Sequence, residues 1–109
     1  MGRMMPRIGQ MKERITIEGP TEVRNTFGEV RIEWQNVGTV WAKVDGMSSR
    51  ETLQAMQANA IVSHKVLIRF FDGITHEHRI VWRNKKMEIA TVIEKMDRRF
   101  HELLVREIQ

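Results

Sequence analysis

The sequence predicts a mainly β domain that carries one short helix. Apolar and polar residues alternate with a period of two in several segments, as they do in strands that bury one face. Asn, Gly and Pro lie between these segments, where chains commonly turn. One uncharged segment with helical features interrupts the alternation near the middle of the chain. The length of 109 residues is that of a single domain with one core.

The N-terminal half contains three alternating segments, "ERITIE", "EVRIEWQ" and "TVWAKV". In each of them every second residue is apolar, so one face of the strand is predicted to point into the core. The residues predicted to point inward are Ile15, Ile17, Val30, Ile32, Trp34, Val40, Ala42 and Val44.

A connection over about 19–29, "GPTEVRNTFGE", separates the first two strands. Pro20, Asn25 and Gly28 are turn-forming residues, and they predict a long loop. Loops of this length are often functional, and the alternative is an ordinary surface loop.

A short helix is predicted over about 49–60. Ser48 and Glu51 have the spacing of a capping box, which satisfies free amides at a helix start. From Thr52 to Ser63 no residue is charged, and few are large and apolar, so the helix gains little from burial in its own domain. Uncharged polar groups can enter a protein interface without the desolvation cost of ions. The segment therefore favours contact with another protein, although an ordinary surface helix has the same pattern.

The C-terminal half also reads as strands. In "KVLIRFF", Val66, Ile68 and Phe70 share one face, and the other face is also partly apolar, so this strand is expected to be covered on both sides. "RIVWR" and "KKMEIATVIE" flank Asn84-Lys85, which predicts a tight hairpin. The final segment, "RRFHELLVREIQ", is closer to helical spacing when its pattern alone is considered.

The composition argues against an enzyme or a metalloprotein. There are no cysteines, so disulfides and thiolate metal sites are excluded. His76 and His78 would share a strand face, but no third ligand accompanies them. No activated nucleophile and no glycine-rich phosphate loop is present. We therefore expect no catalytic residues, no metal and no cofactor.

Tryptophans offer one alternative function. The chain carries a net charge of +4, and Trp41 and Trp82 lie in strands that also contain basic residues. Aromatic side chains on a basic β surface can stack the bases of single-stranded nucleic acid. A small nucleic-acid-binding barrel is therefore an alternative interpretation.

The order of these segments resembles the head–tail joining, or head closure, proteins of long-tailed double-stranded DNA phages. The similarity spans about residues 8–108 and rests on many weak matches in order. It departs from the family at the N-terminal "MGRMMPR" and at Asn84-Lys85, where the family usually has a glycine in the turn. The matching positions are Phe27-Gly28, Trp34, "VWAKV", Ser49-Arg50-Glu51, His64, Gly73-Ile74-Thr75, Trp82 and Ile89.

The resemblance implies a small antiparallel β-barrel of about six to seven strands, in which the C-terminal segment is a strand rather than a helix. It also implies a virion structural protein that forms a homo-oligomeric ring of twelve-fold or six-fold symmetry between portal and tail. Such a ring would extend the DNA channel, help to retain packaged DNA without binding it specifically, and attach the tail. Its expected partners are the portal or a portal-bound adaptor and a tail or tail-completion protein. It would assemble in the host cytoplasm and stay in the virion neck, with no membrane contact.

We expect residues 1–10 to form a flexible basic N-terminal arm and 11–109 a single barrel domain. A tail-completion or tail-terminator ring is a second structural alternative. The expected ring or partner contacts are Arg3, Arg7, Arg24, Asn25, Phe27, Arg50, Gln54, Met56, Gln57 and Asn59. The candidates for lining the channel are Thr21, Glu22, Arg24, Asn25, Met47, Ser48 and Ser49.

Overall fold

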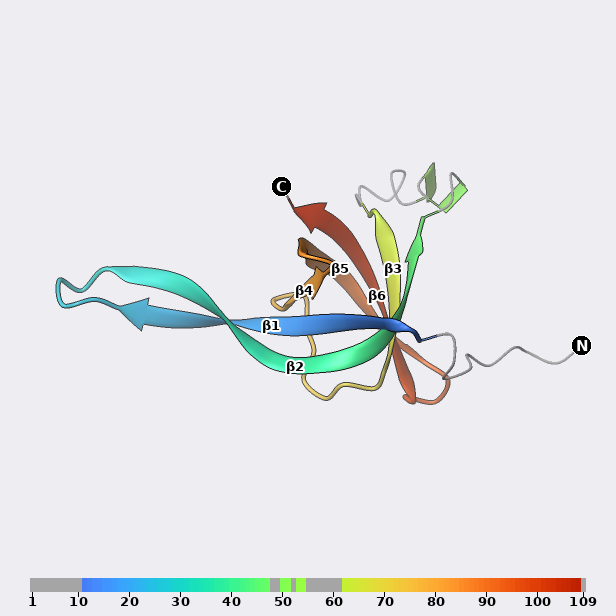
Figure 1. Cartoon of the computed structure of the whole chain (residues 1–109), viewed down its shortest axis with the longest axis horizontal. Helices are drawn as coiled ribbons and strands as arrows, with labels where there is room; N and C mark the ends of the chain where they lie inside the picture. The colour runs from blue at the N-terminus through green and yellow to red at the C-terminus, as the bar shows by residue number, and fades with distance from the viewer. Residues whose placement is uncertain (1–10, 48–49, 52, 55–61, 109) are drawn as a thin grey trace, which may run out of the picture.

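The structure is a computed structural model that describes residues 11–47, 50–51, 53–54 and 62–108. Within them, six antiparallel strands close into a barrel in the order β1-β2-β3-β6-β5-β4 (Figure 1). The expected antiparallel β-barrel is thus confirmed. The strands are β1 (Glu13–Arg24), β2 (Val30–Gly46), β3 (His64–Arg69), β4 (Arg79–Trp82), β5 (Lys85–Lys95) and β6 (Phe100–Ile108).

The core fills the inside of the barrel and follows the alternation of the strands. Ile15 and Ile17 of β1 are buried, as is Ala42 of β2, which confirms the prediction for these positions. Val40 and Val44 pack against this core from either side of Ala42. The remaining members of the cluster are Val66, Ile68, Ile74, Ile80, Met87, Ile89, Leu103 and Val105.

Two long strands leave the barrel together and form a projecting hairpin. Strand β1 pairs with β4 only from Thr16 to Glu18. Among the described residues its outer part pairs with β2 alone. The register shifts between Ile17 and Glu18, which leaves Val37 as an extra residue in β2, and such a bulge bends and twists a strand pair. We call residues 19–36 the stalk; Figure 1 shows it extending away from the barrel.

The prediction of a long loop over 19–29 was wrong for most of its length. Residues 19–24 belong to β1, and only 25–29 form the connection between the strands. Pro20 indicated a turn, but it occupies a position where β1 has only one neighbouring strand. Proline is tolerated in edge strands because a missing N–H can face away from the partner.

The prediction that Val30, Ile32 and Trp34 point into the core was also wrong. All three are exposed, Ile32 at 51% and Trp34 at 37%. Their alternation is that of a strand with one apolar face, as predicted, but a two-stranded ribbon outside the barrel has no second layer to cover that face. Phe70, predicted to share a face with Val66 and Ile68, lies just beyond the end of β3 and is exposed, whereas the other two are buried.

The other predicted elements are mostly as expected. Strand β6 confirms that the C-terminal segment is extended. The tight turn of the β4–β5 hairpin is Arg83-Asn84, one residue earlier than predicted, and both residues have positive φ angles, 51° and 63°. Positive φ at both central positions is the geometry of a type I′ turn, which Asn tolerates. Arg50, Glu51, Leu53 and Gln54 are helical, and the rest of the predicted helix lies outside the described residues.

No helix among the described residues is long and apolar enough to cross a membrane.

Candidate interaction surfaces

The tip of the stalk is a tightly bonded turn that presents one aromatic side chain. The Asn25 side-chain oxygen accepts hydrogen bonds from the backbone N–H of Phe27 at 2.9 Å and of Glu29 at 3.0 Å. The backbone N–H of Gly28 donates to the Asn25 carbonyl, and Gly28 has a φ of 82°, which suits glycine. Phe27 is 86% exposed on this turn. The hydrogen-bonded turn therefore presents the phenyl ring to solvent.

An apolar stripe continues from the tip along one side of the stalk. Val30, Ile32 and Trp34 alternate in β2 and are all exposed. Arg79 of β4 lies over the Trp34 ring at 4.2 Å from its centroid and donates to Glu18 at 2.7 Å, which ties the foot of the stripe to the barrel. Exposed apolar groups gathered in one place indicate an interaction site. The stripe contributes nothing to the barrel's own core.

A pocket of about 360 Å³ lies at the opposite end of the same strand pair. Arg14 and Trp41 face each other in the register of β1 and β2, with the guanidinium 4.6 Å from the centroid of the ring. Arg69, at the end of β3, also lines the pocket. Neither arginine has an acidic partner within the described part of the chain. Met11, Thr39 and Val40 complete a mainly apolar lining.

The two tryptophans that were candidates for base stacking differ. Trp41 is 54% exposed, whereas Trp82 is half-buried and packs against the core. The indole N–H of Trp82 donates to Glu13 at 2.7 Å, and Arg83 lies over its ring at 4.8 Å. Trp82 is thus engaged within the subunit, and the two rings do not form one open stacking platform.

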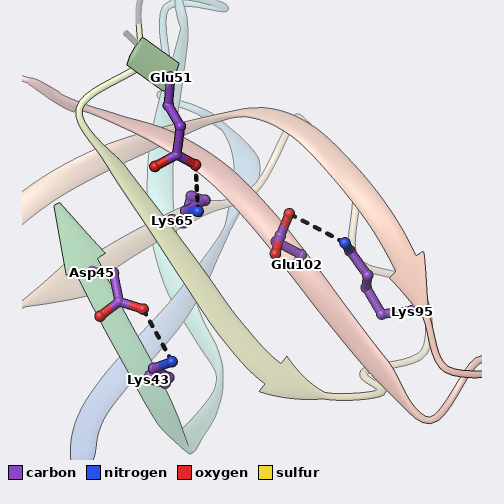
Figure 2. Close-up of polar contacts among 6 residues, drawn as sticks. All are labelled: Lys43, Asp45, Glu51, Lys65, Lys95 and Glu102. Atoms are coloured by element: carbon purple, nitrogen blue, oxygen red, sulfur yellow. Dashed lines mark hydrogen bonds and ion pairs between the residues drawn. The ribbon is translucent and has the colours of Figure 1, made fainter. Parts of the chain in front are cut away.

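Figure 2 shows separate ion pairs formed by residues of β2, β3, β5 and β6 and of the helical segment. The hydrogen bond to Glu51 raises the pKa of Lys65 above its usual 10.5, against the lowering effect of partial burial. This contact holds the start of the helical segment beside β3, where Leu67 is half-buried, in agreement with the prediction that β3 is covered on both sides. The three ion pairs drawn are Lys43–Asp45, Glu51–Lys65 and Lys95–Glu102.

The structure gathers some of the predicted contact residues and separates others. The expected contacts on the outer part of β1 and its turn come together on the stalk. Met47 follows the far end of β2, a 17-residue strand that starts beside the tip, so the two candidate channel-lining groups lie at opposite ends of that strand. Arg50 and Gln54 are exposed on the helical segment. The predicted contact and channel-lining residues that lie on the stalk are Thr21, Glu22, Arg24, Asn25 and Phe27. Those that lie outside the described residues are Arg3, Arg7, Ser48, Ser49, Met56, Gln57 and Asn59.

Sequence reasoning did not find the pocket. Trp41 was singled out only as a stacking residue, and Arg14 and Arg69 were not singled out at all. Arg14 and Trp41 are 27 positions apart and meet only through the β1–β2 register, while Arg69 arrives from a third strand. No short stretch of sequence indicates that these three side chains lie together. No group of His, Asp or Glu that could hold a metal ion occurs among the described residues.

Comparisons with known proteins agree with this architecture. A solution structure of a protein from Shigella flexneri 2a is similar with a TM-score of 0.79 and 28% identity, covering 94% of this chain and 96% of that one. A chain in the virion of a native gene transfer agent particle shares the fold, with a TM-score of 0.61 and 17% identity over 95% of this chain and 98% of that one. No curated protein matches the sequence. The profile of the phage head completion proteins matches residues 6–108, so the chain belongs to that family and is a structural protein of the phage head.

Proposed function

We propose that this protein forms a ring of identical subunits at the vertex where head and tail join. In this role it docks on the portal or on an adaptor bound to it, prolongs the DNA channel and presents a surface to the tail. The membership of the head completion family supports a place at this vertex. A fold shared with a chain of a virion particle agrees with a structural role.

The main support for the proposal is the exposed apolar surface of the stalk. Its apolar stripe lies outside the barrel core. Of the nine large hydrophobic side chains exposed among the described residues, five fall within residues 27–37. A monomer gains nothing by exposing these groups, whereas a subunit with a projecting apolar element can bury them on a neighbour. Many copies held on one portal ring gain avidity, so each contact can be weak.

The charge of the stalk suits passage of DNA better than binding to it. Residues 19–36 contain three acidic and two basic side chains, which give a formal charge of −1. Binding to the DNA backbone depends on neutralising its phosphates with cations. A stalk that reached the channel would therefore retain DNA by narrowing the path rather than by attraction.

Electron microscopy of the protein alone and mixed with purified portal rings tests this proposal. We expect a closed ring of extra density on one face of the portal. As a control, the same protein is mixed with purified tail tubes, which a tail-terminator ring would bind in the absence of portal. A protein that binds neither portal nor tail would contradict the proposal.

A further inference from the structure

We propose that the tip of one stalk inserts into the pocket of a neighbouring copy, with Phe27 entering between Arg14, Trp41 and Arg69 and Glu29 pairing with the arginines. This inference rests on the proposed ring and names the contact that would link its subunits. It is an interaction of one chain with a second copy of the same chain.

The two ends of the β1–β2 pair are complementary in chemistry. The tip carries a phenyl ring 86% exposed and, two residues later, the carboxylate of Glu29, which has no cationic partner among the described residues. The pocket carries a mainly apolar lining and two guanidinium groups that have no acidic partner among the described residues. Glu22 and Arg24 both lie on the outer part of β1, and their formal charges sum to zero. Each end thus lacks the group that the other supplies.

The pocket is large enough for this occupant. A dry cavity of about 150 Å³ can hold benzene in another protein. The pocket here measures about 360 Å³, which leaves room for a phenyl ring and an adjoining carboxylate. Trp41 offers a ring face or edge to Phe27, and such aromatic pairs add to the gain from burial. Arginine binds carboxylates through several parallel donors, so either guanidinium suits Glu29.

A subunit cannot fill its own pocket. From Arg14 to Arg24 the strand advances ten residues, which at about 3.3 Å each separates pocket and tip by about 33 Å. Figure 1 shows the start of β1 at the opposite end of the hairpin from the turn. The contact must therefore join different molecules.

The contact uses two different surfaces, one from each subunit. Such head-to-tail contacts form closed rings when the rotation between neighbours closes, and open chains otherwise. The overall charges also favour this arrangement, because the stalk carries −1 while the whole chain carries +4, which leaves +5 on the rest. Complementary charges of this kind steer association and select the partner surface.

Disulfide trapping tests the contact directly, because the native chain has no cysteine. The double variant Thr26→Cys with Thr39→Cys keeps the Phe27 ring and places one cysteine beside it and one in the pocket lining. It is oxidised in complexes assembled on the portal and as free protein at high concentration. We expect a ladder of linked oligomers, since a disulfide forms only when the two Cα atoms approach within about 7 Å. A mixture of the two single variants should stop at a linked heterodimer.

The matched control pairs Thr26→Cys with Thr91→Cys, an exposed threonine on β5 that does not line the pocket. It should link at background level. Glu29→Arg should slow linkage at Thr39→Cys several-fold, and the added changes Arg14→Glu and Arg69→Glu should restore it. Equal linkage at positions 39 and 91, or none at position 39, would overturn the inference. If the linkage fails but a ring still forms on the portal, only this contact is wrong and the proposed function stands. If the native chain does not bind the portal at all, the proposed function itself is wrong.

Discussion

At the scale of single residues, His101 is the one polar side chain that is buried among the described residues, and we expect its ionisation to couple the stability of the barrel to pH. It lies on β6 with 4% of its surface exposed, and its Nδ1 accepts a hydrogen bond of 3.0 Å from the backbone N–H of Phe71. Phe70 stacks on the imidazole with 4.6 Å between ring centroids. An accepting Nδ1 requires the neutral ring. Desolvation lowers the pKa of His101 below its usual 6.5, with Glu94 raising the pKa and Arg98 lowering it further.

This lowered pKa predicts that the protein loses stability in mild acid. Well above the usual histidine pKa of 6.5, the histidine is neutral in both folded and unfolded chains. As the pH falls below that value, the unfolded chain binds a proton that the folded protein resists, so the free energy of unfolding decreases until the lowered pKa is passed. Urea denaturation between pH 5 and pH 8, chosen around the usual histidine pKa, measures the slope. The variant His101→Gln keeps an acceptor but does not titrate, so it should have a shallower slope. An unchanged slope would show that His101 does not carry the effect.

At the scale of elements, each long strand has an inner half that stabilises the barrel and an outer half that does not. Ile17 in β1 has 0% of its surface exposed, whereas Ile32 in β2 has 51%. We expect Ile17→Ala to lower the free energy of unfolding by about 2–5 kcal/mol, the usual cost of emptying a core site. The same change at Ile32 should stay within about 0.5 kcal/mol. Equilibrium urea denaturation of the two variants checks this pair, and a large loss at Ile32 would mean that the stalk packs against the barrel in solution.

The same contrast explains what the sequence could and could not predict. Period-two alternation located the strands, and it identified Ile15, Ile17 and Ala42 as core residues. It failed at Ile32 and Trp34, because alternation shows which side chains share a face but not whether a second layer covers that face. The long loop was mispredicted because turn-forming residues occur at both ends of 19–29, although only the second group forms the turn. The tight hairpin near Asn84 was placed correctly to within one residue.

The position of the turn was predictable where the signal is local. Asn25 and Gly28 predicted a turn from neighbouring positions, and the structure places Asn25 and Phe27 on that exposed turn, whereas their role as contact residues stays a prediction. The pocket requires the register of three strands, and the C-terminal strand required the resemblance to a family, since its own pattern favours a helix. Register and closure are properties of the whole sheet, so they are absent from any short window of sequence.

At the scale of the whole molecule, the stalk should be separable from the barrel. Glu18 and Asn36 are register partners, so Asn-Gly can replace residues 19–35 as a tight turn. We expect this shortened protein to remain folded, with a free energy of unfolding within about 1 kcal/mol of the native value, because shortening a connection changes its closure entropy little. It should no longer assemble on the portal. Thermal denaturation and electron microscopy measure the two properties, and an unfolded product would contradict the separation.

The bulge at Val37 has one further consequence. Beyond it, two paired strands with both flanks unshielded are marginal in water, so their amide protons should exchange with solvent long before those of the enclosed strands. Because this outer section does not pack on the core, its two strands can separate without removing contacts from the barrel. A free subunit could then fray and re-form at its far end while staying folded, and capture by a neighbour would lock the section in place. At the vertex, each subunit that joins the ring would then suppress the fraying of the stalk that it binds, so the stalks would become ordered one after another.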